Sequence, residues 1–406
     1  MYLIFFQGHL MDFYEKSILF FLIPFLVWIT NIWSSFRRFI VFCGMSVLLA
    51  LILYQNHLER SEQIFLLKYV FSSQSAISWM NIFFILSMIF YWISIVRFPL
   101  IHLAKKFAWV AVFMGTTGIL VRWREGYLIN VDIGHVPISN LYEVLILLCL
   151  VISLFYLYYE NKYPTGVLGG FIFTIVTSLV IFIEWYSINR DANQIQPLVP
   201  ALNSWWIKLH VPANFIGYGG FCLSGIIGFA YLIKLNLNNK KDKKVFSSSI
   251  KHFPLFMIGS LLFLFPFIYV GKPSEIWIYF LLTNIIVSIF IFSIRNRIAS
   301  MLPDLEILDD MIYKGISIGF TFFTIAIILG ACWAAEAWGS YWQWDPKETW
   351  SLIVWMNYAA FLHARLSRGL RGGIIACWSM FGVLIISFAF LGVNIFLSGL
   401  HSYGDL

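Results

Sequence analysis

Two histidines and a group of tryptophans are the residues of this chain best suited to bind a large flat ligand. His210 and His401 each lie beside a strongly apolar segment, and neutral imidazole is a common axial ligand of haem iron. Trp338, Trp342 and Trp344 fall within the segment WGSYWQWDPKETW. Several indoles on one short segment offer an apolar surface on which a planar ligand can stack. These residue types favour a porphyrin site in which two imidazoles bind the metal.

The same region also has a simpler structural interpretation. Tryptophans form belts at membrane interfaces, where they need bind no ligand. Asp345 precedes Pro346 and lies three residues before Glu348, which is the spacing of a capping box at the start of a helix. Asp345 is therefore expected to satisfy free backbone N–H groups, to contact the ligand, or to do both.

A third histidine is predicted to lie far from this group. His363 follows Glu348 by 15 residues, which corresponds to roughly 22 Å along an unbroken helix. An ionisable residue within a membrane span is a candidate for function. His363 therefore suggests a second haem station near the opposite, inner face of the membrane.

The composition requires a lipid environment. Of 406 residues, 60% are hydrophobic and 12% are charged, whereas soluble domains carry about 25% charged residues. The net charge of +7 is better explained by basic membrane loops than by nucleic-acid binding. Five cysteines without CxxC spacing argue against a disulfide framework, a zinc site or covalently bound haem.

Twelve segments are apolar enough to suggest membrane spans, each of which needs about 20 such residues. We predict an all-α, polytopic transmembrane bundle of about 12 spans with a tryptophan-rich loop on its outer face. The predicted spans are 17–35, 39–55, 79–96, 107–121, 141–159, 167–185, 209–235, 253–271, 276–294, 315–335, 349–365 and 373–397.

The distribution of basic residues predicts the orientation. Most Lys and Arg residues fall in alternate loops, which suits the positive-inside rule if both termini lie on the outer side. This arrangement brings His210, His401 and the tryptophan segment to the outer face. Arg122, Arg124 and Lys347 are outer cations that are candidates for pairing with haem propionates, with anchoring at the interface as the alternative.

The motifs around these residues resemble a known family. WGSYWQWDPKETW is similar to the WWD signature of proteins that handle haem in cytochrome c maturation. The helix containing LHAR, the ending GLHSYG and the upstream stretches GHVPISNLYE, LVPALNSW and LHV resemble CcsA, the haem-handling half of the System II cytochrome c synthase. Plastid-encoded CcsA proteins look most similar, over about residues 107–406.

The resemblance implies roles for particular residues. His210 and His401 match the outer axial ligands, and His363 matches the histidine of an intramembrane haem site. His135 lies in a matching motif without a clear role. The signature that presents haem b to apocytochrome is matched by Trp338, Trp342, Trp344 and Asp345.

The resemblance also implies a function and partners. The chain is expected to hold haem transiently for attachment to CxxCH-bearing apocytochromes c, such as cytochrome f and cytochrome c6, as a subunit of a cytochrome c synthase. A separate CcsB-type membrane protein is the expected partner, and it would supply the unidentified second ligand of the inner haem. The expected location is the plastid thylakoid membrane or, alternatively, a bacterial inner membrane.

Two divisions of the chain and two alternative functions complete these expectations. Residues 1–106 are expected to add N-terminal transmembrane helices to a CcsA-type domain at 107–406, with the WWD loop at 333–350. A System I haem lyase or haem-delivery protein shares the tryptophan signature, but the DPKETW continuation and the terminal histidine argue against it. A polytopic transporter is the other alternative, although no matching pair of broken spans stands out.

Overall fold

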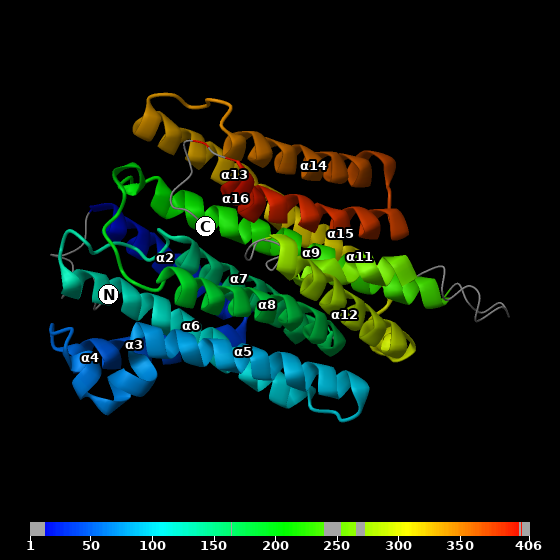
Figure 1. Ribbon diagram of the computed structural model, residues 1–406, viewed down its shortest axis with the longest axis horizontal. Helices are drawn as coiled ribbons and strands as arrows, with labels where there is room; N and C mark the ends of the chain where they lie inside the picture. Colours follow the sequence, from blue (N-terminus) through cyan, green and yellow to red (C-terminus); the bar gives the residue numbers. More distant parts are fainter. Residues whose placement is uncertain (1–12, 164, 239–252, 265–272, 398, 400–406) are drawn as a thin grey trace.

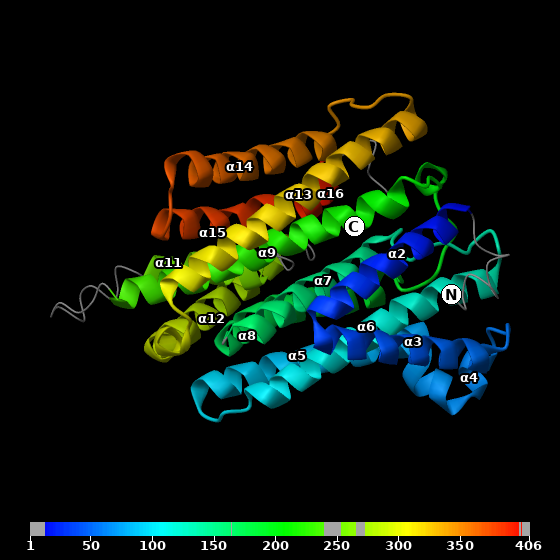
Figure 2. The same cartoon turned by 180° about the vertical axis from the view of Figure 1, so that it is seen from behind.

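The computed structural model describes residues 13–163, 165–238, 253–264, 273–397 and 399. Every regular element in these ranges is a helix, and long helices lie side by side (Figures 1 and 2). The elements are α2 (Phe13–Ile32), α3 (Ser34–Tyr54), α4 (Arg60–Gln63), η1 (Leu67–Phe71), α5 (Ser73–Val96), α6 (Ile101–Ile129), α7 (Leu141–Lys162), α8 (Gly166–Arg190), η2 (Pro200–Leu202), α9 (Ile207–Asn238), α11 (Phe253–Leu264), α12 (Pro273–Met301), α13 (Leu305–Trp338), α14 (Pro346–Arg368), α15 (Gly373–Ser387), η4 (Phe388–Gly392) and α16 (Val393–Phe396).

Ten of the described helices are long and apolar enough to cross a membrane. The prediction of a polytopic all-α bundle is therefore confirmed. Of the two remaining predicted spans, 349–365 lies within α14, and the described part of 253–271 is α11. α14 is the less apolar of these two because charged and polar side chains such as Glu348, Asn357 and Arg365 interrupt it.

Helix α6 is much longer than the predicted span 107–121. Its extension contains Arg122 and Glu125, and both are buried with partners. Arg122 Nε donates to Glu143 Oε1 at 2.8 Å, and Glu125 Oε1 accepts from the Ser73 backbone N–H at 2.9 Å. Hydropathy ends the span at these charges, but the fold continues the helix because it neutralises them. Because α6 begins at Ile101, the predicted domain boundary at 106/107 falls inside this helix.

Helix α9 lies at the centre of the bundle and is almost entirely buried. It packs most extensively against α13, and glycines permit the close approach. A Cβ atom at Gly220 would lie 2.7 Å from the Gly315 oxygen and 3.0 Å from Gly319 Cα. Small residues on facing helices are typical of close packing in membranes. This contact fixes α13 alongside the start of α9, where His210 lies.

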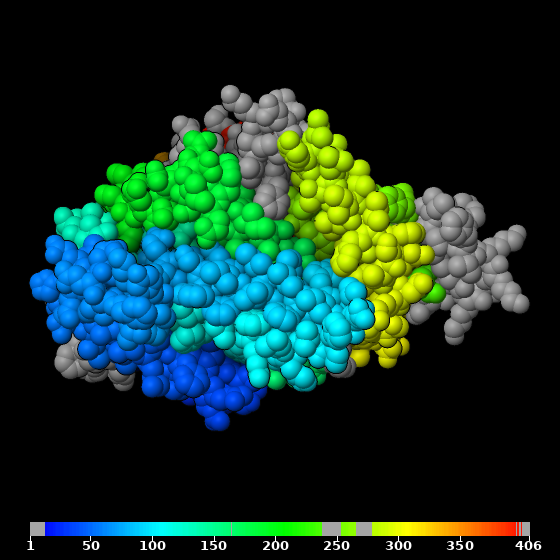
Figure 3. All heavy atoms as spheres, turned by 60° about the horizontal axis from the view of Figure 1, so that its bottom comes forward, coloured from blue at the N-terminus to red at the C-terminus, as the bar shows by residue number. Residues whose placement is uncertain are grey.

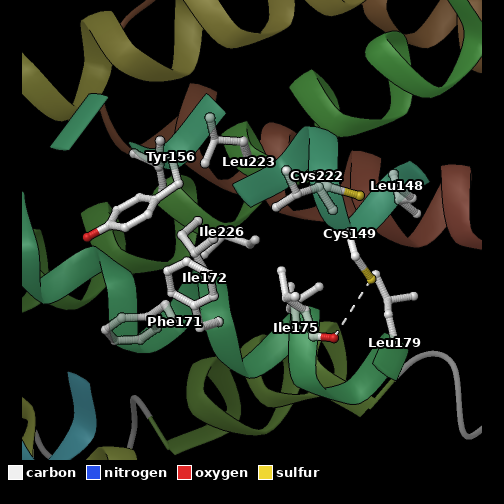
Figure 4. Packing of buried hydrophobic residues seen from close by; sticks show 14 of the residues in the cluster. Leu148, Cys149, Tyr156, Phe171, Ile172, Ile175, Leu179, Cys222, Leu223 and Ile226 are labelled. Atoms are coloured by element: carbon white, nitrogen blue, oxygen red, sulfur yellow. Dashed lines mark hydrogen bonds between the residues drawn. The ribbon is translucent and has the colours of Figure 1, made fainter. Parts of the chain in front are cut away.

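The core continues from α9 into α7 and α8 (Figure 4). Tyr156 of α7, Phe171 of α8 and Ile226 of α9 are fully buried there. Cys149 and Cys222 are buried in the same region, and all five cysteines are free. This core joins α7, α8 and α9 along the bundle.

The N-terminal helices cover one side of the bundle. α3 to α6 form the blue and cyan face in Figure 3, next to α12 in yellow. α5 packs against α8, where Tyr91 stacks on Phe173 with ring centroids 5.4 Å apart. Buried residues on both sides of residue 106 thus share one core.

Contacts at the two ends of the bundle agree with the alternating arrangement of spans. At one end, Tyr127 Oη donates to Glu15 Oε2 at 2.8 Å and Lys208 pairs with Glu15 at 3.5 Å. These bonds join the start of α2, the end of α6 and the start of α9. At the other end, Arg365 of α14 pairs with Asp309 of α13 at 2.5 Å.

Candidate functional site

A cavity of about 550 Å³ lies at the end of the bundle where α9 begins and α13 ends. Its volume is in the range of ligand pockets, roughly 300–1,000 Å³. Its walls come from the starts of α7, α9 and α14, the ends of α8 and α13, the segment 190–202 and η4. The aromatic side chains that line it are Tyr186, Phe215, Tyr218, Phe323, Trp333, Tyr341, Trp342 and Phe390.

His210 lines this cavity from the first turns of α9. Its Nδ1 lies 2.7 Å from the carbonyl oxygen of Ala326 on α13. A carbonyl oxygen only accepts hydrogen bonds, so Nδ1 carries the proton and Nε2 keeps its lone pair. Histidines that bind metals commonly donate their other ring N–H to a carbonyl in this way. His210 is therefore in the tautomer that an axial ligand of iron requires.

Asp345 and Glu348 form the predicted capping box at the start of α14. The Asp345 carboxylate accepts the Lys347 backbone N–H at 3.0 Å, and Glu348 Oε2 accepts the Asp345 N–H at 3.3 Å. The helix-capping role of Asp345 is confirmed. Its contact with a ligand stays a prediction.

The tryptophans of the signature do not form one flat surface. Trp342 lines the cavity. The ring of Trp344 packs edge-on against the ring of Trp342, with an interplanar angle of 87°. Trp338 packs instead on Trp333, with centroids 5.0 Å apart. The predicted loop 333–350 is largely helical, because α13 extends to Trp338 and α14 begins at Pro346. The short connection 339–345 turns the indoles in different directions.

Trp344 occupies an unusual backbone conformation within this connection. Its φ of 57° lies in the left-handed region, which is strained for a bulky residue and typical of functional sites. Glu348 Oε2 also accepts the Gln343 N–H at 2.8 Å, so one carboxylate oxygen binds the backbone on both sides of Trp344. The indole of Trp344 remains 69% exposed at the end of the molecule.

Of the three predicted propionate partners, only Lys347 lines the cavity. Arg122 is buried and uses its guanidinium to bind Glu143 and the carbonyls of Asn193 and Gln194. Arg124 donates to Asn56 Oδ1 at 2.6 Å. Lys347 lies in the first turn of α14, before the predicted span, and burial lowers its pKa to about 8 while the Asp345 carboxylate opposes that shift.

His363 lies at the opposite end of the same helix. α14 is continuous from Pro346 to Arg368, so His363 and the cavity are separated as predicted. His363 is exposed, and its Nδ1 lies 3.3 Å from Ser367 Oγ. Arg365, two residues further on, belongs to the ion pair with Asp309 at that end.

His401 lies outside the described residues. Gly399, however, lies beside the start of α14, where a Cβ atom on it would approach Asp345 Cγ and Pro346 Cδ to 3.0 Å. The last described part of the chain therefore reaches the connection that carries the tryptophans.

His135 and Asn140 have structural roles at the start of α7. Asn140 Oδ1 accepts the Glu143 N–H at 2.9 Å and so caps α7. The two ring nitrogens of His135 lie 2.7 Å from the Ile133 oxygen and 2.8 Å from Ser139 Oγ. Because both nitrogens are engaged, His135 is a packing residue here.

Sequence reasoning missed three neighbours of His210 on α13. Ala326 binds its Nδ1, Gly330 faces its ring, and Trp333 packs 6.0 Å from it. Their spacing of four and three residues places them on one helix face. That spacing is visible in the sequence, but nothing in it indicates that this face meets His210.

These features define a class: a multi-pass helical membrane protein with a histidine and aromatic rings around a cavity at one end of the bundle. The family model described as cytochrome C assembly protein matches residues 138–401. Several relatives are named cytochrome c biogenesis protein CcsA. One from Chlorella vulgaris is 36% identical over 72% of this chain and 82% of the relative. Others come from Nicotiana tomentosiformis (35%, covering 73% and 84%) and Gloeobacter violaceus (34%, covering 78% and 91%).

The chain belongs to the cytochrome c assembly family, and its resemblance to the CcsA proteins is confirmed. It is a multi-pass membrane protein with a role in cytochrome c biogenesis. This family implies that it handles haem.

Proposed function

We propose that the chain binds haem b in the cavity beside His210 and presents it for covalent attachment to c-type apocytochromes. The observation that carries this proposal is the His210–Ala326 hydrogen bond of 2.7 Å, which leaves Nε2 available as an iron ligand in an aromatic cavity. His401 is the proposed opposite ligand. The assignment of His401 is supported by the position of Gly399, which precedes it by two residues and lies beside Asp345.

The aromatic residues and the cation suit the other parts of the haem. Trp342 and Trp333 provide apolar walls for the porphyrin, and Lys347 provides a positive charge for a propionate. Trp338, Trp344 and Asp345 shape and support this wall from the adjoining helix ends and connection. When an apocytochrome arrives, its own histidine would replace one imidazole, and its CxxCH thiols would add to the haem vinyl groups.

The proposed partner is a separate CcsB-type protein, and His363 supports it. His363 is exposed on α14, so a haem bound to it would be covered on one side only by the described residues of this chain. Another protein would cover the other side and complete that site. The proposed location is the thylakoid membrane. The names of the relatives favour cytochrome maturation over the transporter alternative.

Absorption spectroscopy of the purified, haem-loaded protein tests this proposal. We expect the spectrum of low-spin haem with two imidazole ligands, and its loss in the His210→Ala/His401→Ala double variant. His102→Ala is the matched control, because His102 is exposed near the start of α6, away from the cavity. A protein that stays colourless after loading with haem would contradict the proposal.

A further inference from the structure

One face of α13 encloses the imidazole of His210. Ala326 and Gly330 are one helical turn apart and both line the cavity. Ala326 binds Nδ1 through its carbonyl oxygen, while Gly330 leaves room for the ring. Trp333, one turn further along, lies with its ring centroid 6.0 Å from that of His210 and tilted by 34°. The helix therefore contacts the ring at several points.

The absence of a side chain at position 330 has no backbone explanation. Gly330 lies inside a regular helix and is not among the glycines with positive φ. A glycine in such a position destabilises a helix relative to alanine. A Cβ atom on Gly330 would lie 2.8 Å from His210 Cε1 and 3.0 Å from Nδ1, closer than side chains normally approach. The imidazole is thus the group that excludes a methyl group at this position.

We propose that Gly330 is a positioning residue that sets the plane of the His210 imidazole. This inference rests on the proposed role of His210 as an iron ligand. With glycine at 330, the Cε1–Nδ1 edge of the ring lies close enough to α13 to keep the Nδ1–H···O bond to Ala326. A methyl group would push the ring away, lengthen that bond and turn Nε2 from its direction.

The expected consequence is a change in the haem site with little change elsewhere. Loss of the group that accepts the other ring N–H of a metal-binding histidine typically weakens metal affinity about 10–100-fold. We expect Gly330→Ala to weaken haem binding by about that factor. The electron paramagnetic resonance spectrum of the ferric protein should also change, because it responds to the orientation of the axial imidazole planes.

Two controls separate the ring contact from a general effect on folding. Gly44→Ala on α3 introduces the same methyl group where no atom lies within 4 Å of it, so haem binding should be unchanged. In a His210→Gly background there is no ring to displace, so any loss of thermal stability caused by Gly330→Ala should largely disappear. An equal loss with and without the His210 ring would overturn the inference.

Rescue by free imidazole distinguishes this inference from the proposed function. Imidazole added to His210→Gly should restore the low-spin spectrum, and failure to restore it would count against His210 as an iron ligand. If rescue succeeds but Gly330→Ala binds haem with the affinity and resonance spectrum of the wild type, the role of Gly330 alone is refuted.

Discussion

Lys347 gives the cavity a positive charge that depends on pH. Burial lowers the pKa of this amine to about 8, so the side chain changes from cation to neutral amine between about pH 7 and pH 9. A hydrogen bond to a charged group contributes about 1.5–3 kcal/mol, which corresponds to roughly a 10–100-fold effect on affinity. We therefore expect Lys347→Met to weaken haem binding by about that factor, measured by titration at pH 7.

The same residue should make haem binding weaker as the pH rises. The charged form predominates below about pH 8, so affinity for a carboxylate is retained there and lost above it. Lys347→Arg keeps its charge at both pH 7 and pH 9, so this variant should bind haem with an affinity that does not depend on pH in this range. Haem dimethyl ester, which lacks the carboxylates, should bind wild type and Lys347→Met equally. Arg124→Gln is the control, since Arg124 binds Asn56 outside the cavity. A preference for haem over the ester that is as large in Lys347→Met as in the wild type would contradict this role.

The ion pair between Arg122 and Glu143 stabilises one wall of the cavity from outside the cavity. Both side chains are buried, and Arg122 also holds the carbonyls of Asn193 and Gln194 in the segment that forms one wall. Removing one partner of a buried pair typically costs about 3–5 kcal/mol. We expect Glu143→Gln to reduce the free energy of unfolding in detergent by an amount approaching this range. Glu62→Gln, which breaks the exposed pair with Lys68, should have almost no effect. Similar losses in both variants would contradict the assignment.

At the residue scale, the sequence predicted local interactions well and tertiary ones poorly. The caps at Asn140 and Asp345 follow from side chains that bind their own helix ends, so their spacing is sufficient. Two other features depend on distant partners. Gly330 is explained by a ring on α9, and Arg122 by carbonyls beyond α8. Residue type alone therefore did not show that Lys347 lines the cavity while Arg122 binds Glu143.

At the scale of helices, α2 supports the segment that carries His210. Glu15 is buried between Lys208 and Tyr127, and Tyr14 stacks on Trp205 with an interplanar angle of 8°. Lys208 and Trp205 precede His210 by two and five residues. The start of α2 thus contacts both the end of α6 and the start of α9.

Weakening this support should disturb the haem site from outside the cavity. Glu15→Gln keeps a hydrogen bond to Tyr127 but removes the charge that Lys208 faces. We expect a few-fold loss of haem affinity, and we expect the low-spin spectrum to persist because Ala326 still holds His210. Lys208→Met should give a similar loss, and adding Glu15→Gln to it should cause little further change, since the two act through one contact. Fully additive losses would show that Glu15 does not act through Lys208.

The helices themselves were predictable because long apolar runs leave few alternatives in a membrane. Their ends were not, for a physical reason visible in α6 and α14. In α6 the charges of Arg122 and Glu125 are neutralised by partners from other elements, so the helix runs to Ile129. In α14 the polar residues reduce hydropathy, yet Glu348 caps the helix and Arg365 pairs with Asp309. A hydropathy profile contains neither kind of partner.

At the scale of the whole molecule, α14 links the cavity to a surface at the other end of the bundle. Ile353, Met356, Ala360, His363 and Ser367 are exposed at spacings of three and four residues, so they form one face of α14. A histidine that faces hydrocarbon is unfavourable unless another group contacts it. The apolar neighbours of His363 suit the packing of a partner helix, and Ala360 permits a close approach.

A partner on this face should determine how much haem the protein holds. We expect this chain alone to retain haem that depends on His210, and its complex with a CcsB-type protein to hold additional haem that depends on His363. Ala360→Trp should block docking and remove the additional haem, because an indole would hold the helices apart. Ile286→Trp on α12 places the same side chain on another exposed face and should leave the complex intact. Haem content and co-purification measure both effects. If His363→Ala lowers the haem content of the chain without its partner, or if Ala360→Trp still forms the fully loaded complex, then α14 does not form a shared site.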